Sequence, residues 1–327
     1  MKKVRFGIIG SNFIVDRFLE AAKRCDGFEL CAIYSRDIDR AKQFAEKKGI
    51  SYYFDNLTAF FECKEIDAVY IASPTCCHAK QSLLAMKSGK HVICEKPIAS
   101  NYKEAFTMFR TAGENNVVLM EAMRPVFNPA YEVIRQEMRS IGKVRQVNLT
   151  YCQYSSRYDK FKQGIIENAF KTELSNGAIM DIGCYCIQVM ILLFGAPKRI
   201  LAMDIHLPDS IDGIGNIMAG YEDFLVHISY SKITNSNEPN EIQGEAGILS
   251  FEDVTNPKEL KLELSKQEKE IELPKEEHDM LYEIETFLRS VDAGQADSRF
   301  EICSLETMKV IDEARRQLHI VFPADEE

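Results

Sequence analysis

Five short apolar runs alternate with segments rich in helix formers in the first third of the sequence. The runs are VRFGII (4–9), ELCAIY (29–34), DAVYIA (67–72), HVIC (91–94) and NVVLM (116–120). Helices are expected between them, at 13–24, 38–48, 76–88 and 102–114, with Ser100 placed to cap the last one. Strands that are apolar almost throughout and alternate with helices predict a doubly wound parallel sheet with helices on both faces.

The pattern changes beyond residue 121. Partial two-residue alternation appears at 142–154, and further β-like segments follow near 198–207, 215–232, 241–251 and 258–273. Helices are expected at 177–194, 276–292 and 303–318. The chain therefore belongs to the α/β class, with a parallel-sheet domain at 1–121 and an α+β domain at 122–327 that is built on a large, mainly antiparallel open sheet.

Size and charge narrow the classes of partner. A chain of 327 residues suits two domains, and 40 basic against 50 acidic residues give a net charge of −10. This balance leaves no basic surface for nucleic acid or an anionic membrane. No apolar run approaches the roughly 18 residues of a membrane span and no signal-peptide cleavage site follows the start, so a cytoplasmic location is expected.

Cysteine and histidine usage gives no sign of a metal. The ten cysteines include no Cys-x-x-Cys pair and the six histidines no metal-type pair, so free thiols and no metal site are expected.

The first strand runs into a glycine turn and a helix, the arrangement that binds dinucleotides in a Rossmann fold. Gly10 fits the first glycine of G-x-G-x-x-G, but Asn12 stands at the second position and Val15 at the third. Asparagine tolerates positive φ better than most residues, so Asn12 does not abolish binding. Phe13 and Ile14 complete this candidate cofactor turn; its weak match leaves a plain turn as the alternative.

The end of the second strand predicts the cofactor. NAD binders usually carry an acidic residue there to bind the ribose hydroxyls, and this chain has Ser35 followed by Arg36. A hydroxyl beside a guanidinium suits a 2′-phosphate. We therefore expect NADP, while the nearby Asp37 keeps NAD open and a solvated surface position is the alternative for Arg36.

Glu95-Lys96-Pro97 follows the fourth of these apolar runs, and ligands of doubly wound sheets bind beyond the carboxyl ends of the strands. A lysine there is placed to bind a substrate hydroxyl and the cofactor. The stretch SPTCCHAKQSLLAMKSGKHVICEKPIAS (73–100) resembles the central motif of the glucose–fructose oxidoreductase, inositol dehydrogenase and MocA-like (Gfo/Idh/MocA) oxidoreductase family. The resemblance covers nearly the whole chain and implies a Rossmann domain followed by a domain with a large open sheet.

The same resemblance assigns roles around this motif. It makes Lys96 the catalytic-site lysine, places Glu95 beside the cofactor, and implies a cis bond between Lys96 and Pro97. It also implies that the loop bearing Ser73, Pro74 and His78 lines the cofactor.

A second motif, Asp181-Ile182-Gly183-Cys184-Tyr185, resembles the family's Asp-x-Gly-x-His/Tyr helix. The resemblance makes Tyr185 the general acid/base and Asp181 a catalytic-site anchor for substrate. Residues four apart share one helix face, which agrees with this pairing. The alternative is an amphipathic helix in which Asp181 caps a backbone group and Tyr185 is merely packed.

The segment LMEAMRPVFNPAYEVIR (119–135) is similar to the family segment that borders the active site. Glu121, Arg124 and Asn128 are candidates for substrate contact, and Arg124 has a structural carboxylate partner as its alternative.

The expected function is hydride transfer between NADP, or NAD, and a secondary alcohol or carbonyl of a sugar, polyol or dihydrodiol-like substrate. The tyrosine version of the second motif most resembles the dihydrodiol dehydrogenase branch of the family. Alternatives are an NAD-dependent glycoside hydrolase of the same fold and an inactive cofactor-binding sensor, which only Asn12 favours. Relatives cover the open sheet by self-association, which implies a homodimer or homotetramer through the C-terminal sheet. The charged segment 258–279 is expected to form a hairpin.

Overall fold

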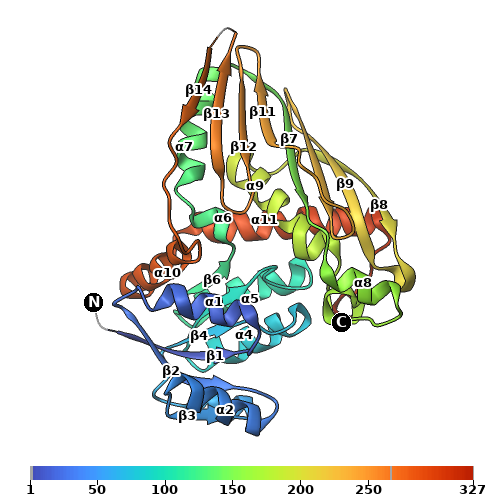
Figure 1. Cartoon of the computed structure of the whole chain (residues 1–327). Coiled ribbons are helices and arrows are strands. Elements are labelled where there is room, and N and C mark those ends of the chain that lie inside the picture. Colours follow the sequence, from blue (N-terminus) through green and yellow to red (C-terminus); the bar gives the residue numbers. More distant parts are fainter. Residues whose placement is uncertain (1–2, 266, 327) are drawn as a thin grey trace. The chain divides into compact units, whose positions relative to one another are not determined.

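The computed structural model describes residues 3–265 and 267–326 (Figure 1). The chain divides into two compact units. Unit 1 comprises the residues up to Met123 together with Glu276–Ile302, and unit 2 comprises Arg124–Lys275 together with the residues from Cys303 onward. The division differs from the expected ranges 1–121 and 122–327 chiefly in Glu276–Ile302, because helix α10 (Leu281–Ala293) packs on α1 (Phe13–Ala22).

Unit 1 is built on a six-stranded sheet in the order β3-β2-β1-β4-β5-β6, with all adjacent strands parallel. The strands are β1 (Val4–Ile9), β2 (Phe28–Tyr34), β3 (Tyr52–Phe54), β4 (Ala68–Ile71), β5 (His91–Glu95) and β6 (Leu119–Ala122). The helices between them are α1, α2 (Ile38–Lys48), α3 (Leu57–Glu62), α4 (His78–Lys87) and α5 (Tyr102–Glu114), with the short turn η1 (Thr75–Cys77) before α4. The parallel sheet and its alternation with helices confirm the expectation.

Local details differ from the sequence expectation. The strand β3 and the helix α3 were not expected, because β3 has only three residues and α3 only six. The cap of α5 is Asn101 and not Ser100, since the Asn101 side chain accepts from the N–H of Glu104 at 2.9 Å.

Aromatic rings fill the core of unit 1. Phe6 of β1 lies 6.3 Å from Phe18 and 5.7 Å from Phe287 between ring centroids, so one strand residue joins α1 and α10. Phe18 stacks on Tyr70 of β4 at 3.8 Å. Each fully buried side chain of this size contributes about 1.5–3 kcal/mol, and together they hold α1 on the sheet behind the glycine turn.

Unit 2 contains an eight-stranded sheet in the order β14-β13-β12-β11-β7-β10-β9-β8. The strands are β7 (Val144–Cys152), β8 (Arg199–His206), β9 (Asp212–Gly220), β10 (Leu225–Ser231), β11 (Asn240–Gly244), β12 (Ile248–Glu252), β13 (Lys258–Leu264) and β14 (Gln267–Ile271). β7 and β10 pair in parallel, and the other neighbours pair antiparallel. The mainly antiparallel sheet and the β13–β14 hairpin are confirmed.

One face of this sheet is covered and the other carries exposed apolar side chains. Helix α9 (Cys184–Phe194) packs on β7 and β10 (Figure 1). On β8 the side chains alternate, so that Ile200 is buried while Leu201, Met203 and Ile205 are 69%, 78% and 62% exposed. The outer edge of the sheet at β8 is therefore an apolar surface.

The other helices and turns of unit 2 are α6 (Arg124–Phe127), α7 (Ala130–Glu137), η2 (Met138–Ile141), α8 (Ser156–Lys162), η3 (Asn168–Phe170), η4 (Thr172–Leu174), the π-helical turn η5 (Ile179–Gly183), η6 (Pro208–Ser210), most of α11 (Ser298–Leu318) and η7 (Pro323–Asp325). Contrary to expectation, Thr172–Phe194 is long and apolar enough to span a membrane. Its most apolar window is 78% buried inside the structure, which is typical of a core helix.

Candidate active site

The glycine turn between β1 and α1 requires a glycine at its first position. Gly10 has φ +118°, and a Cβ atom there would lie 2.7 Å from the carbonyl oxygen of Ala72. Both the backbone conformation and the close approach exclude a side chain. The turn therefore brings the end of β1 against the end of β4, at the edge of the sheet where ligands of this fold bind.

Asn12 serves as the N-cap of α1. Its φ is −88°, so the turn does not use the tolerance of asparagine for positive φ. Its side-chain oxygen accepts from the N–H of Val15 at 3.4 Å, and its Nδ2 donates to the carbonyl of Ala72 at 3.2 Å. Asparagine is among the preferred N-cap residues, so it starts the helix without a second glycine. Beside it, Phe13 is 63% exposed and Ile14 half-buried.

The end of β2 leaves a hydroxyl and a guanidinium available while the nearby acid is engaged. The carboxylate of Asp37 caps α2 by accepting from the N–H groups of Asp39 and Arg40 at 3.0 and 3.2 Å. Ser35 is half-buried, with its Oγ accepting from the N–H of Asp37 at 3.3 Å, and Arg36 is exposed. Asp37 is thus committed to the helix, which weakens the argument for an acidic ribose ligand.

The side chain of His78 contacts the backbone of the loop after β4. This imidazole is 1% exposed, with Nδ1 3.0 Å from the carbonyl of Pro97 and Nε2 2.9 Å from the carbonyl of Ser73. Burial lowers the pKa of His78, and the two carbonyl oxygens act in the opposite direction. His78 therefore links the loop of Ser73 and Pro74 to the Glu-Lys-Pro segment, which favours a supporting role over direct cofactor contact.

The Glu-Lys-Pro segment is anchored by its glutamate. Tyr70 donates to Glu95 Oε1 at 2.6 Å, and the other oxygen of Glu95 accepts from the N–H of Lys96 at 3.3 Å. Glu95 is 9% exposed and Lys96 half-buried. The Lys96–Pro97 bond is cis, which confirms that expectation. Glu95 therefore fixes the backbone at Lys96, because its carboxylate is bonded both to Tyr70 of β4 and to the N–H of Lys96.

Two residues predicted to contact substrate are buried and form hydrogen bonds to backbone N–H groups. Glu121 is 4% exposed and accepts from the N–H of Ile98 at 2.9 Å. Asn128 is 5% exposed, accepts from the N–H of Ala130 and donates to Asn256 Oδ1 at 2.9 Å. These contacts favour structural roles for both residues.

The Asp-x-Gly motif forms the π-helical turn η5, not the regular helix that the sequence predicted at 177–194. Such turns occur often at functional sites. Gly183 permits close packing, because a Cβ atom there would lie 3.1 Å from the ring of Tyr230 on β10. Asp181 lies in this turn with its side chain 36% exposed, and its Oδ2 is 2.7 Å from the ammonium of Lys232.

Tyr185 stands in the first turn of α9 with its phenol oxygen in contact with a cation. Tyr185 is 6% exposed, and the ring of Tyr151 packs edge-on against its ring, with 5.7 Å between the ring centroids. Arg124 Nη2 donates to the Tyr185 oxygen at 3.3 Å, and its guanidinium carbon is 5.6 Å from the ring centre. Unit 2 therefore brings together a phenol and a guanidinium from the predicted site.

Three residues of these networks were missed from the sequence: Tyr70, Asp212 and Lys232. Asp212 caps the Asp-x-Gly segment by accepting from the N–H groups of Ala178 and Ile179 at 3.0 and 2.6 Å. Each lies within or next to a strand where a polar residue is not distinctive. No local signal in the sequence identifies them.

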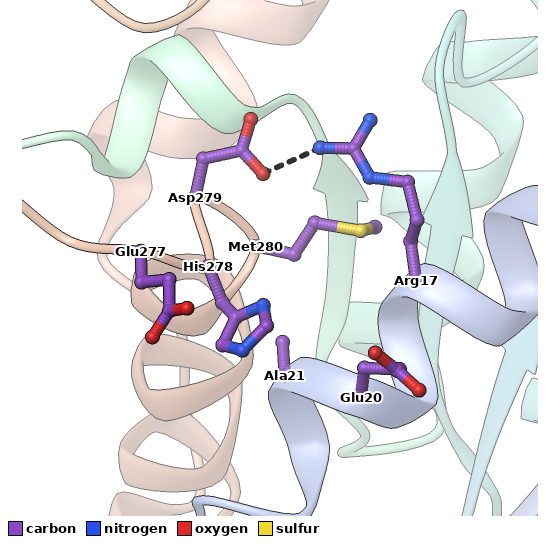
Figure 2. A pocket seen from close by; sticks show the side chains of 7 residues that line it. All are labelled: Arg17, Glu20, Ala21, Glu277, His278, Asp279 and Met280. Atoms are coloured by element: carbon purple, nitrogen blue, oxygen red, sulfur yellow. Dashed lines mark hydrogen bonds and ion pairs between the residues drawn. The ribbon is translucent and has the colours of Figure 1, made fainter.

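Figure 2 shows a pocket of about 130 Å³ elsewhere in unit 1, between α1 and the segment before α10. The arginine in its lining forms an ion pair, since Arg17 Nη2 lies 2.8 Å from Asp279 Oδ1. It is lined by Arg17, Glu20, Ala21, Glu277, His278, Asp279 and Met280, none of which belongs to the predicted site.

Two family models match the chain. Residues 4–123 match the oxidoreductase family with an NAD-binding Rossmann fold, and residues 131–250 match the GFO/IDH/MocA C-terminal domain. Together the matches cover more than half of the chain.

Curated relatives and solved structures are similar over nearly the whole length. The chain is 43% identical to a scyllo-inositol 2-dehydrogenase (NADP(+)) of Bacillus subtilis, over 99% of each protein. It is 26% identical to trans-1,2-dihydrobenzene-1,2-diol dehydrogenase of Mus musculus, over 98% of this chain and 99% of the relative. A crystal structure of a 3-ketoreductase from Actinomadura kijaniata with NADP and TDP-benzene superimposes with a TM-score of 0.88, at 25% identity over 97% of this chain and 98% of that one.

Proposed function

The chain belongs to the Gfo/Idh/MocA oxidoreductase family, and from that premise we propose that it is an NADP-preferring dehydrogenase of a cyclic polyol or sugar. It is an oxidoreductase that acts on CH–OH groups, as its family and its relatives are. The observation that carries the finer proposal is the hydrogen bond from Arg124 to Tyr185 of the second motif. The 43% identity to an inositol dehydrogenase supports it.

The residues at the end of β2 support NADP over NAD. Arg36 is exposed and offers forked, charge-assisted donors that suit a 2′-phosphate, and Ser35 adds a hydroxyl. Asp37, the acid that would favour NAD, caps α2 instead. The relative from Bacillus subtilis is named for NADP(+). The turn at Gly10 leads into the N-terminus of α1, and backbone N–H groups at a helix N-terminus suit a pyrophosphate.

The proposed mechanism assigns the proton to Tyr185. When bound, the nicotinamide accepts or donates the hydride. Tyr185 takes the proton from the substrate hydroxyl as the alcohol becomes a carbonyl, and Arg124 stabilises the negative charge on the Tyr185 oxygen that makes it a base. The family motif assigns Lys96 the role of the supporting lysine, and within unit 2 we assign Asp181 to accept a hydrogen bond from substrate.

Two charged groups of unit 2 support a substrate class. The carboxylate of Asp181 and the guanidinium of Arg124 suit a substrate with several hydroxyl groups, because each can bind a hydroxyl. We therefore assign a cyclic polyol such as an inositol as the first substrate class, with dihydrodiols as the second.

The test is an absorbance assay at 340 nm with NADP⁺ or NAD⁺ and a panel of inositol isomers, aldoses and trans-dihydrodiols. We expect NADPH to form with at least one inositol and NAD⁺ to be used less efficiently. Release of a sugar from a glycoside without net absorbance change would point to the hydrolase alternative. Tight NADPH binding without turnover of any compound would point to a sensor, which Asn12 no longer favours now that it has a capping role.

The apolar outer face at β8 supports self-association. Leu201, Met203 and Ile205 are each more than half exposed, and contiguous apolar surface of this kind marks interfaces. We assign it to a homodimer or homotetramer in the cytoplasm, consistent with ten free cysteines. Light scattering of wild type and Met203→Glu tests this: the variant should shift to a smaller species, and an unchanged mass would exclude this face.

A further inference from the structure

A lysine with almost no solvent exposure lies next to the Asp-x-Gly turn. Lys232 follows the last residue of β10 and is 2% exposed. Removing an ammonium group from water is unfavourable unless a carboxylate and further acceptors satisfy its three N–H donors. A buried lysine at this position therefore requires partners for its ammonium group.

The ammonium has three partners from two segments. Its Nζ lies 2.7 Å from Asp181 Oδ2 and donates to the carbonyl of Ala169 at 2.9 Å. It also lies 4.8 Å from the centre of the Phe170 ring, within the range of a cation–π contact. One charged group thus joins the carboxylate of the predicted site to the turn at 168–170.

The backbone of Lys232 is fixed on both sides. Its N–H donates to the carbonyl of Gly213 at 2.9 Å, and its own carbonyl accepts from the N–H of Ser155 at 2.8 Å. Ser155 is the N-cap of α8, so the backbone of Lys232 is bonded both to β9 and to the start of α8. These two hydrogen bonds fix the position from which the side chain of Lys232 extends.

The segment that contains Ala169 has a small core of its own. Phe170 packs with Phe161 at 5.2 Å between ring centroids, and both join Ile211 in one buried cluster. A displacement of this cluster moves the Ala169 carbonyl and the Phe170 ring, and hence two of the three partners of the ammonium. The position of Asp181 is coupled to that of the cluster through Lys232.

We propose that Lys232 is a positioning residue that fixes the charged carboxylate of Asp181 and couples it to the segment 155–175. The inference rests on the proposed function, in which Asp181 accepts a hydrogen bond from the substrate. With the ammonium present, one carboxylate oxygen is held and the group keeps a single direction. Without it, Oδ2 of Asp181 loses this buried counter-charge, and Lys232 no longer fixes the orientation of the carboxylate.

A double-mutant cycle tests the coupling. Lys232→Met removes the charge at similar length, and Lys232→Gln keeps a donor for the Ala169 carbonyl should the first variant fold poorly. Each is combined with Asp181→Asn, and kcat and KM for the polyol and Kd for NADPH are measured. We expect kcat/KM to fall on the order of 10-fold or more in the Lys232 variants, mainly through KM, with Kd for NADPH unchanged. In the Asp181→Asn background the same substitutions should have little further effect.

Lys90 provides the matched control. It is also a buried lysine, 9% exposed, and its ammonium donates to the carbonyls of Cys63 and Ile66, both at 2.8 Å, in unit 1. Lys90→Met removes a buried ammonium whose partners are these carbonyls and not Asp181, so it should reduce stability and leave KM for the polyol unchanged. Folded Lys232 variants with wild-type kcat/KM, or losses that add fully to that of Asp181→Asn, would overturn the proposal.

Hydrogen exchange separates this inference from the proposed function. Amides in 155–175 and 178–183 should exchange faster in Lys232→Met and remain protected in Lys90→Met. If the wild-type protein turns over no polyol, the proposed function fails, while the exchange comparison still decides whether Lys232 couples the two segments. Unchanged protection of both segments in Lys232→Met would contradict the coupling.

Discussion

Arg124 donates a hydrogen bond to the phenol oxygen of Tyr185, with 3.3 Å between Nη2 and the oxygen. The sequence predicts either a substrate or a structural carboxylate as the partner of this arginine, whereas the structure pairs it with the phenol of the predicted acid/base residue. A guanidinium stays protonated at all ordinary pH values, so it favours the anionic form of a neighbouring oxygen without itself titrating. Unit 2 thus carries a charged partner for Tyr185 within its own fold.

Tyr185→Phe should abolish the proton transfer and little else. The ring is buried, so phenylalanine fills the same space, and the loss of a general acid/base costs on the order of 10²–10⁴ in turnover. Absorbance at 340 nm measures kcat, and NADPH fluorescence measures cofactor binding, which should not change. Turnover equal to that of wild type would remove Tyr185 from the mechanism.

Arg36→Ala should weaken binding of NADPH and leave NADH unaffected. Hydrogen bonds to a charged group contribute about 1.5–3 kcal/mol, which corresponds to roughly 10- to 100-fold in Kd. Fluorescence titration with both cofactors checks the prediction. Arg110→Ala is the control, because Arg110 is a surface arginine paired with Glu114 on α5. Equal weakening for NADPH and NADH would show that Arg36 does not read the 2′-phosphate.

Gly10→Ala should disable the cofactor turn. The added methyl group meets the Ala72 carbonyl at 2.7 Å in a backbone conformation that alanine rarely adopts, so we expect lower stability and loss of NADPH binding. Gly113→Ala is the control: that glycine lies in α5, a Cβ atom there would have nothing within 4 Å, and alanine should be neutral or stabilising by up to about 1 kcal/mol. Normal NADPH affinity in Gly10→Ala would contradict the assigned turn.

Asp212 should make stability depend on pH. Burial raises the pKa of this carboxyl to about 6, from an ordinary value of 3.8. A carboxyl whose pKa is raised by folding stabilises the protein at low pH, and this contribution is lost as pH rises through about 6. The difference in Tm between wild type and Asp212→Asn should therefore be more favourable to wild type at pH 5 than at pH 7.5. A difference that is constant, or more favourable at pH 7.5, would refute the assignment.

Much of the first unit could be predicted from local pattern. The apolar strands, the helices and the conformationally required Gly10 each follow from residue type at fixed spacing, and so does the cis bond once the family motif is recognised. Asn12 shows the limit: its residue type suggested positive φ, whereas the fold uses its side chain as a cap. Both uses suit asparagine, and only the folded backbone, with φ −88° and the bond from the Val15 N–H, distinguishes them.

The parts that could not be predicted depend on contacts between distant segments. Lys232 and Asp181 lie far apart in the sequence, and a single lysine after a strand has no distinctive pattern. The same holds for Asp212, which caps the Asp-x-Gly segment from another strand. Residues 276–302 group with unit 1 because Phe287 packs on Phe6, a contact that periodicity cannot reveal.

The measurement that tests the central claim most directly is transfer of deuterium from NADPH to an inositol ketone. The enzyme is incubated with the 2-ketone of inositol and with NADPH deuterated at C4, in its two epimeric forms in turn, and the inositol product is analysed by mass spectrometry. Direct hydride transfer predicts a product that carries one deuterium with one epimer and none with the other. Unlabelled product with both epimers, or no product from a protein that binds NADPH tightly, would contradict the proposed polyol dehydrogenase.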